Sequence, residues 1–389
     1  MDHSSQNIID INNLKKRVLI VFGTRPEAIK MAPLAKEFET NEAFISNTCV
    51  TAQHREMLDQ VLDFFKLDID YDLDLMKPNQ DLFQLTSRII SELKNVFYDF
   101  KPDYVFVHGD TTTTLAASLA AFYYGAKICH VEAGLRTYNK FSPFPEEINR
   151  QLTSKLADYH FAPTLMSKKN LLKEDICKSS ILVTGNTVID ALFSSVELAN
   201  SNPSNKIKEV SNKINGKEFI LVTGHRRENH GKGFIEICNA LKEIANKFKD
   251  ILIIYPVHLN PKVQDPVKKI LSDIPNIILE QPLPYEDFIW LMDKCKLIIT
   301  DSGGVQEEAP SLGKPVLVMR DTTERPEAVK VGTVILVGTN KDLIVKTTSE
   351  LIKNKMKYDK MSKLHNPYGD GFASKRIVEY INKLKWNMM

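Results

Sequence analysis

The chain has 389 residues, a formal net charge of +2, 43% hydrophobic residues and 26% charged residues. These fractions are those of an ordinary soluble globular protein, and a chain of this length is expected to fold as two domains. The near-neutral charge gives no reason to expect nucleic acid or an anionic membrane as a partner.

The cysteines and the N-terminus bear on the cellular compartment. Five scattered cysteines form no CxxC pair. This spacing predicts buried thiols in a reducing cytoplasm, and neither disulfides nor a metal site. The first apolar run, Val18–Phe22, is too short for a signal peptide or a membrane span. Residues 1–16 are predicted to be a loose extension.

Short β-rich runs alternate with helical stretches along the chain. Most of the runs are apolar at consecutive positions, which is typical of strands buried on both faces of a parallel sheet. The order of the elements predicts an α/β fold with helices on both sides of each sheet. The predicted strands are Val18–Phe22, Tyr104–His108, Lys127–Val131, Ile181–Thr184, Phe219–Thr223, Ile251–Pro256, Leu297–Thr300, Val316–Met319 and Val334–Val337.

The two halves of the chain are laid out alike. Each opens with a strand, a glycine turn and a basic residue, at Gly23-Thr24-Arg25 and at Gly224-His225-Arg226. We therefore predict two Rossmann-like, doubly wound parallel-sheet domains, with the polar segment 201–217 as the best linker candidate. Ligands of such sheets bind beyond the carboxyl ends of the strands, so two facing domains would form one deep cleft.

Two cations follow the first predicted strand. Arg25 stands two residues after Gly23, and Lys30 comes shortly afterwards. Because Pro33 cannot donate a backbone hydrogen bond, we expect the helix proper to start there, with both cations on the loop or its first turn. The alternative is a solvated pair of charges, which the tight exit made by Gly23 and Pro26 disfavours.

Acidic residues end strands or loops of the first half. Asp110 and Glu132 follow strands, and Glu146 and Glu147 open a helix. Each acid alone has a common structural explanation: a helix cap for Asp110, an ion pair with an arginine for Glu132, and dipole complementation for the two glutamates. Together, carboxylates opposite a cationic phosphate site suit general acid/base chemistry on a nucleotide-linked sugar.

The segment Asp301-Ser302-Gly303-Gly304 stands between an apolar strand and a short helix. The glycines allow close approach of a ligand, and the free N–H groups of the helix favour a phosphate or diphosphate. Glu307 and Glu308 could then reach sugar hydroxyls. The alternative is a capped helix after a tight turn, with glutamates that complement the dipole.

Further donors follow other strands of the second half, namely His225, Arg226 and Arg325, while His258 alone would more often be a satisfied core histidine than a ligand. No DxD-like cluster is placed to lead a carboxylate pair to a metal, and there is no HExxH or Cys/His spacing, so no metal is expected. There is also no GxGxxG after the first strand and no Walker pattern. We therefore expect no cofactor, and phosphate binding by helix ends and basic side chains.

Long segments, in one order from about Val18 to Arg376, resemble the bacterial non-hydrolysing UDP-N-acetylglucosamine 2-epimerases, which have a two-Rossmann, GT-B architecture. The segments are GTRPEAIK (23–30), TAQHREMLDQV (51–61), HGDTTTT (108–114), HVEAGLRT (130–137), PFPEEINR (143–150), GNTVIDAL (185–192), GHRREN (224–229), YPVHLNP (255–261), TDSGGVQEEAPSLGKPVL (300–317), RDTTERPEA (320–328) and NPYGDG (366–371). The resemblance implies an N-terminal domain of residues 17–185, to which 367–389 return, and a UDP-binding domain of residues 186–366.

The resemblance also implies roles for individual residues. The catalytic set would be Asp110, Glu132, Glu146 and His225; the substrate-binding set would be Arg25, Lys30, Leu283, Phe288, Ser302, Gly303, Gly304, Glu308 and Arg325. Within the second set, Leu283 and Phe288 would line the uracil pocket and Glu308 would hold the ribose. A second UDP-N-acetylglucosamine, acting as an activator, would contact Gln53, Glu146, Arg226 and His258. The loop 77–80 lacks an arginine that some relatives carry.

The implied reaction is inversion at C2 of UDP-N-acetylglucosamine to give UDP-N-acetylmannosamine, through elimination of UDP, a 2-acetamidoglucal and re-addition. A homodimer that supplies a precursor for cell-surface polysaccharide is also implied. Three alternatives stay open at this stage: a hydrolysing epimerase of the same fold, a retaining glycosyltransferase, and a sugar-nucleotide sensor without turnover.

Overall fold

The computed structural model describes residues 15–51, 55–75, 80–323 and 325–384, with only the backbone described for 55–57. The chain divides into two compact units, residues 1–191 with 372–389 and residues 192–371. The chain passes from the first unit to the second after residue 191 and returns after residue 371, in each case a few residues beyond the boundary expected from the sequence. Each unit is described by itself below.

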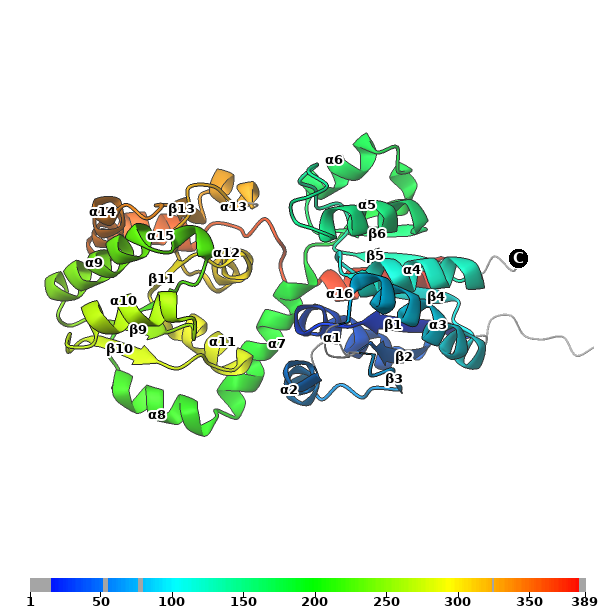
Figure 1. Ribbon diagram of the computed structural model, residues 1–389, viewed down its shortest axis with the longest axis horizontal. Coiled ribbons are helices and arrows are strands. Elements are labelled where there is room, and N and C mark those ends of the chain that lie inside the picture. The colour runs from blue at the N-terminus through cyan, green and yellow to red at the C-terminus, as the bar shows by residue number, and fades with distance from the viewer. Residues whose placement is uncertain (1–14, 52–54, 76–79, 324, 385–389) are drawn as a thin grey trace, which may run out of the picture. The chain divides into compact units, whose positions relative to one another are not determined.

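The first unit is built on a seven-stranded sheet in the order β3-β2-β1-β4-β5-β6-β7 (Figure 1). Its elements are β1 (Lys16–Phe22), α1 (Arg25–Glu39), β2 (Phe44–Val50), α2 (Arg55–Phe65), β3 (Tyr71–Asp72), α3 (Leu82–Phe100), β4 (Tyr104–His108), α4 (Thr112–Tyr124), β5 (Lys127–Val131), α5 (Glu146–Leu156), β6 (Tyr159–Ala162), α6 (Leu165–Lys173), a 3₁₀ turn (Lys178–Ser180), β7 (Ile181–Val183), the start of α7 (Thr187–Ser201) and α16 (Ala373–Lys383).

The second unit is built on a six-stranded sheet in the order β10-β9-β8-β11-β12-β13. After α7 its elements are α8 (Asn205–Ile214), β8 (Phe219–Thr223), a 3₁₀ turn (Arg227–Asn229), α9 (Lys232–Lys247), β9 (Leu252–Pro256), α10 (Pro261–Leu271), β10 (Ile277–Glu280), α11 (Tyr285–Lys294), β11 (Leu297–Thr300), α12 (Gly303–Glu308), a 3₁₀ turn (Ala309–Leu312), β12 (Val316–Val318), α13 (Pro326–Val331), β13 (Val334–Leu336), α14 (Lys341–Lys353) and α15 (Lys355–Ser362).

The predicted fold class is confirmed. Every strand pairing described in the two sheets is parallel. The central strands are buried along their whole length, as β4 and β11 illustrate, because helices cover both faces. Apolar side chains of β1 and β4 pack with Phe97 of α3 in one core, and those of β8 and β11 pack with Phe234 of α9 in the other.

Four strands were not predicted: β2, β3, β6 and β10. Their burial is mixed, as in β2, where Phe44 and the last three residues are buried but Ile45 is exposed. Strands β2, β3 and β6 lack the continuous apolar run on which the prediction relied, whereas β10 has such a run, Ile277–Leu279, and was missed. The two central strands of each sheet were predicted, and these matter most for the site.

The segment 201–217 is not a linker, contrary to the prediction. It contains helix α8, whose Ile207, Val210 and Ile214 are buried in the second unit. These three apolar residues at helical spacing form one stripe, which the polar residues between them obscured. The prediction of buried thiols also needs one correction, because the five cysteines are free but Cys177 is exposed.

Helix α16 returns to the first unit and lies against α1 (Figure 1). The Lys16 ammonium on β1 donates to the carbonyls of Ile381 and Leu384, at 2.6 and 2.8 Å, and so occupies the C-terminal end of this helix. At the other end, the Asp190 carboxylate accepts the N–H groups of Ala373 and Ser374. The C-terminal helix is therefore held at both of its ends by charged side chains.

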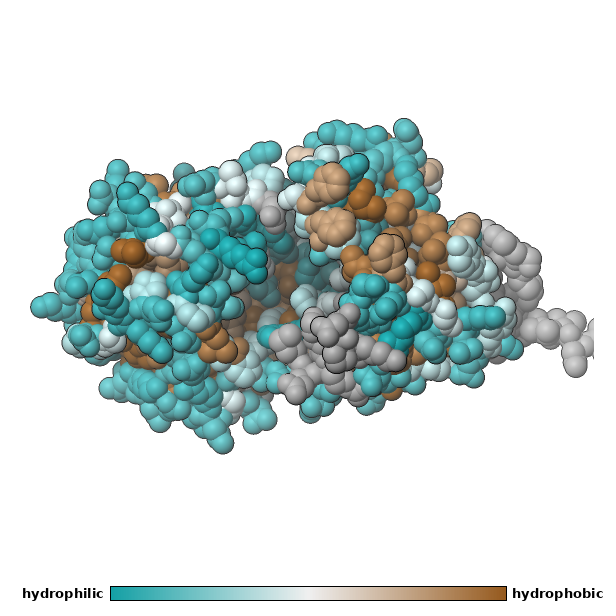
Figure 2. Space-filling model, in the orientation of Figure 1, coloured by the Kyte–Doolittle hydropathy of each residue, from teal (hydrophilic) through white to brown (hydrophobic). Residues whose placement is uncertain are grey.

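The surface of the first unit carries exposed apolar side chains, which gather in brown in Figure 2. They include Phe122 of α4 at 60% exposure, Leu152 of α5 at 48%, and Phe141 and Phe144 of the intervening loop at 71% and 65%. No helix in the described part of the chain is both long and apolar enough to cross a membrane.

Candidate active site

In both sheets the candidate residues follow the two strands at which the strand order reverses. In the first unit these strands are β1 and β4, which lead to Arg25 and Asp110. In the second they are β8 and β11, which lead to His225 and Ser302. Doubly wound sheets bind ligands at this switch point, beyond the carboxyl ends of the strands.

Helix α1 places Lys30 inside a regular helix, which corrects the sequence prediction. The helix begins at Arg25, and Pro33 lies within it. Thr24 and Glu27 form a capping box that defines the start, with Pro26 in the first turn. Lys30 is therefore rigidly held rather than on a loop, and Arg25 is the first helical residue.

The buried Glu27 carboxylate also joins the two switch-point loops. It accepts the N–H groups of Gly23 and Thr24, at 3.1 and 2.8 Å, and the hydroxyl of Thr111, at 2.7 Å. Burial raises the pKa of Glu27, and these hydrogen bonds oppose that rise. The loop that follows β1 and the loop that follows β4 are thus held together at the point where Asp110 emerges.

Glu132 forms the most constrained part of the site. Its backbone has a φ of 62°, in the left-handed region that a non-glycine residue rarely adopts. One carboxylate oxygen lies 2.5 Å from the Lys30 ammonium and 2.8 Å from the Asn186 amide nitrogen, and the other lies 3.6 Å from His108 Nε2. The predicted alternative, an ion pair with a neighbouring arginine, is wrong, because Arg136 pairs with Glu174 instead.

The charges around Glu132 decide its protonation. Burial alone would raise the pKa of its carboxyl, but the nearby Lys30 and His108, together with hydrogen bonds from Lys30 and Asn186, lower the pKa to about 2. Burial lowers the pKa of His108 to about 4, so this imidazole is neutral near pH 7. Glu132 is therefore an ionised carboxylate held by one cation.

The pKa of Asp110 is displaced in the opposite direction. Burial raises the pKa of its carboxyl to about 6; Glu132 and Glu146 add to this rise, while Arg150 and Lys30 oppose it. The alternative role as a helix cap is excluded, because Thr111 is the N-cap of α4 and accepts the N–H of Thr114. Asp110 is therefore free of a capping role and titrates close to neutral pH.

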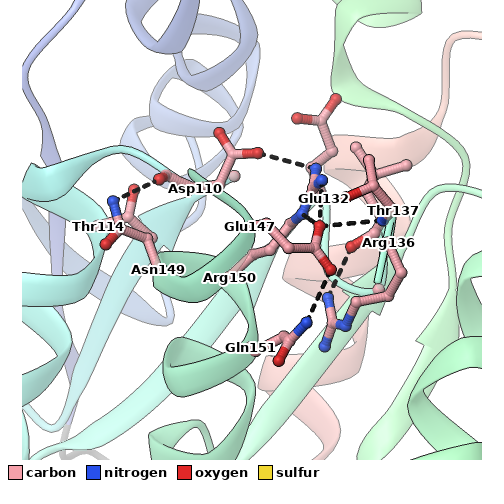
Figure 3. A network of polar contacts seen from close by, with 12 residues as sticks. Asp110, Thr114, Glu132, Arg136, Thr137, Glu147, Asn149, Arg150 and Gln151 are labelled. Atoms are coloured by element: carbon pink, nitrogen blue, oxygen red, sulfur yellow. Dashed lines mark hydrogen bonds and ion pairs between the residues drawn. The ribbon is translucent and has the colours of Figure 1, made fainter. Parts of the chain in front are cut away.

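Helix α5 carries Arg150 and Glu147, which lie on the side of Asp110 (Figure 3), and it begins with Glu146. Arg150 donates from Nη1 to Asp110 Oδ2 at 3.1 Å, and through Nε and Nη2 it pairs with the buried Glu147. Glu146, the first residue of the helix, keeps one buried carboxylate oxygen without a hydrogen-bond partner in the described part of the chain. A buried acceptor of this kind is available to a ligand donor.

In the second unit, helix α12 begins at Gly303 with Ser302 as N-cap, but the Ser302 hydroxyl makes no capping bond. A Cβ on Gly303 would lie 2.8 Å from Arg325 Nη1, so this glycine allows the guanidinium to sit against the start of the helix. Arg325 also donates from Nε to Glu307 at 2.5 Å. Free helix N–H groups beside a guanidinium make an anion-binding arrangement.

Buried Asp301 shapes the loop that carries His225 and Arg226. Its Oδ2 accepts the backbone N–H groups of both residues at 2.9 Å. The His225 ring stacks on that of His258, with centroids 5.5 Å apart, and burial lowers the pKa of His225 while Asp301 opposes this. His258 is exposed, so the core interpretation of this histidine is wrong.

The remaining predicted residues are less constrained. Glu308 is 8% exposed on α12, and its carboxylate lies next to Gly304. Leu283 and Phe288 are half-buried, in the loop before α11 and on α11. Gln53 and residues 77–79 lie outside the described residues. Among the described residues, no group of three His, Cys, Asp or Glu side chains could hold a metal ion.

The family model described as UDP-N-acetylglucosamine 2-epimerase matches residues 36–382. The chain belongs to the UDP-N-acetylglucosamine 2-epimerase family. It is therefore an isomerase by family, and the resemblance seen in the sequence is confirmed.

Individual members of the UDP-N-acetylglucosamine 2-epimerase family match almost end to end. The enzyme of Campylobacter jejuni is 57% identical over 378 residues, which span 96% of this chain and 99% of that protein. The crystal structure of the Neisseria meningitidis enzyme bound to UDP-GlcNAc has a TM-score of 0.82 at 53% identity and covers 95% of this chain and 100% of its own. The Methanocaldococcus jannaschii enzyme in complex with UDP-GlcNAc and UDP has a TM-score of 0.73 at 34% identity, with 94% and 99% covered.

Four residues of the site were not assigned from the sequence: Glu27, Arg150, Asn186 and Asp301. All four stand inside the segments that carry the family resemblance, so their presence in those segments was the available signal. The roles of these residues could not be assigned from the segments alone, because partners such as Thr111 for Glu27 and Glu132 for Asn186 lie far away in the sequence.

Proposed function

We propose that this chain interconverts UDP-N-acetylglucosamine and UDP-N-acetylmannosamine by inversion at C2, without net hydrolysis. The observation that carries the proposal is the pair Asp110 and Glu132, which follow neighbouring strands and whose pKa values are displaced in opposite directions, to about 6 and about 2. Two carboxyl groups with separated pKa values suit a reaction in which one proton leaves and another is delivered. Relatives that were crystallised with UDP-GlcNAc or UDP support the choice of substrate.

The C2 hydrogen of an acetamido sugar is not acidic enough for direct removal. In the proposed reaction the C1–O bond breaks first, and its electron pair leaves with UDP. A carboxylate takes the C2 proton, and the C2–H electrons form the C1=C2 bond of 2-acetamidoglucal. Another carboxyl group then delivers a proton to C2 from the opposite face while a UDP oxygen adds to C1. Each aligned donor to the leaving diphosphate would contribute about 3–4 kcal/mol.

The binding roles are part of the same proposal. Ser302, Gly303 and Gly304 would hold the diphosphate, together with Arg25, His225 and Arg325. Glu308 would bind the ribose hydroxyls, and Leu283 and Phe288 would line the uracil pocket. The geometry that supports this assignment is the guanidinium of Arg325 against Gly303, at the start of α12. Lys30 is better assigned to Glu132, because its ammonium already lies 2.5 Å from that carboxylate.

Three further expectations belong to this proposal. A second UDP-N-acetylglucosamine would bind as an activator at Gln53, Glu146, Arg226 and His258, in support of which Glu146 keeps a buried oxygen without a partner in the described chain. The protein would form a homodimer, in support of which the first unit exposes Phe122 and other apolar residues. It would act in the cytoplasm to supply a precursor for cell-surface polysaccharide.

Incubation with UDP-N-acetylglucosamine in deuterated water tests the reaction. We expect deuterium at C2 in the recovered UDP-sugars and two epimers at equilibrium. Free UDP that accumulates in step with free N-acetylmannosamine would instead identify a hydrolysing enzyme. Unlabelled C2 with transfer to an added acceptor would identify a glycosyltransferase, and no conversion at all would identify a sensor.

A further inference from the structure

The Arg150 guanidinium is shared between two acids of different exposure (Figure 3). Its Nη1 lies 3.1 Å from Asp110 Oδ2, and its Nε lies 2.7 Å from Glu147 Oε2, while Nη2 bonds to the same Glu147 oxygen. The Glu147 side chain has no exposed surface and that of Arg150 is 9% exposed, whereas Asp110 is 28% exposed. Of these three side chains, Asp110 is therefore the most accessible to a ligand.

Glu147 is fixed by more than this arginine. Its carboxylate also accepts the backbone N–H groups of Thr137 and Tyr138, at 3.0 and 2.9 Å, and the amide of Gln151, at 2.7 Å. With so many donors on two oxygens, the carboxylate has one orientation, and burial is offset by these bonds so that its pKa falls to about 2. The anion that holds Arg150 is thus permanent and immobile.

Helix α5 also forms a hydrogen bond to the backbone of Asp110. The Asn149 amide donates to the Asp110 carbonyl at 3.0 Å, beside the Arg150 contact to the carboxylate. Glu147 and Arg150 lie at i and i+3 on α5, so both project from one face of the helix. Helix α5 therefore restrains the main chain and the side chain of Asp110 at once.

We infer that Glu147 and Arg150 are a positioning pair for Asp110, in which Glu147 orients the guanidinium and the guanidinium orients the carboxylate and favours its ionised form. The inference deepens the proposed function and rests on it for the role of Asp110 in proton transfer. Because Arg150 does not depend on any ligand for its geometry, the pair acts in the empty enzyme as well.

Four charged groups face Asp110 from three elements: Lys30 of α1, Glu132 after β5, and Glu146 and Arg150 of α5. Arg150 is the strongest of the influences that favour the ionised carboxylate. Its removal leaves burial and two carboxylates to act against a single remaining cation, Lys30. The pKa of Asp110 should then rise by about 1 unit or more, as expected when an opposite charge within hydrogen-bond distance is lost.

The test compares Arg150→Met and Arg150→Lys with the wild type. The first readout needs no substrate: the pKa of the Asp110 carboxyl, followed by NMR in protein labelled with ¹³C at aspartate Cγ and assigned with Asp110→Asn. We expect it to rise in Arg150→Met and to return most of the way in Arg150→Lys, which keeps the charge. An unchanged pKa in Arg150→Met would overturn the inference whatever reaction the wild type catalyses.

The second readout is the pH dependence of kcat. The limb that belongs to Asp110 should move to higher pH in Arg150→Met, with kcat lowered about 10–100-fold. Combining Arg150→Met with Asp110→Asn should cost little beyond Asp110→Asn alone, since Arg150 acts through Asp110. Independent losses that multiply in the double variant would mean a merely structural arginine.

Arg136→Met is the matched control. The Arg136 side chain is buried and pairs with Glu174 at 2.7 Å, in the same part of the first unit, but it does not contact Asp110. It should lower the melting temperature without moving the Asp110 pKa or the pH profile. If Arg150→Met is too unstable to titrate, Arg150→Lys decides, because a lysine ammonium lacks the planar fork that joins Asp110 to Glu147 and should still lower kcat while the pKa stays near that of the wild type.

Discussion

The Lys30 ammonium lies 2.5 Å from the Glu132 carboxylate, although 102 residues separate the two in the chain. Lys30 is held by a capped helix and Glu132 by a strained backbone at a strand end, so neither partner can easily move away. The pair keeps one acid of the site ionised, while Asp110, which follows the neighbouring strand β4, titrates near neutral pH.

Asp110→Asn should abolish most of the turnover. The amide keeps the size of the side chain but cannot accept or deliver the proton, so kcat should fall about 10²–10⁴-fold. Binding of UDP, measured by titration calorimetry, should stay within a few-fold of the wild type, because Asp110 is not among the proposed ligands of UDP. Near-normal rates in this variant would remove Asp110 from the acid/base set.

Glu132→Gln should lower both activity and stability. The substitution leaves the half-buried Lys30 ammonium without its anion, and breaking a buried pair costs about 3–5 kcal/mol when one partner stays charged. Denaturant unfolding measures this loss. Glu39→Gln is the control, since it breaks the exposed Lys36–Glu39 pair and should cost less than about 1 kcal/mol. Equal losses in the two variants would contradict the prediction.

Titration of Asp110 should contribute to the pH dependence of the free energy of unfolding. Its pKa of about 6 in the folded state lies above the ordinary value of 3.8, so the folded protein binds this proton more tightly than the unfolded chain. The contribution to the free energy of unfolding is therefore full below about pH 4 and is lost as the pH rises through 6. Between pH 4 and pH 8, the free energy of unfolding of the wild type should therefore fall by up to about 2 kcal/mol relative to that of Asp110→Asn, which lacks this group. A constant difference across that range would contradict the assignment.

Asp301→Ala should weaken UDP binding. The substitution removes the acceptor of the His225 and Arg226 N–H groups and leaves these donors unpaired, so the loop should lose its orientation. We expect at least a ten-fold rise in the dissociation constant of UDP, together with a lower melting temperature. Glu280→Gln is the control, because it breaks the buried contacts to Lys206 and Lys213 and should lower stability while UDP affinity is retained.

Much of the fold could be read from hydrophobic pattern. The central strands β1, β4, β8 and β11 are continuous apolar runs because both of their faces are covered, and that pattern depends on neighbouring residues alone. The start of α1 was misplaced at Pro33 because a proline within a helix resembles a helix start when only local chemistry is considered.

The sequence by itself determined the α/β class and the family, and it predicted which acids belong to the site, since these depend on residue types in a fixed local order. Only the tertiary structure decided which cation each acid meets: Lys30 for Glu132, and Arg150, shared with Glu147, for Asp110. Charges interact through space and through the depth of burial, and parallel strands bring together loops that the chain itself keeps far apart. That is why the opposite pKa settings of two similar carboxylates could not be foreseen from their neighbours in the sequence.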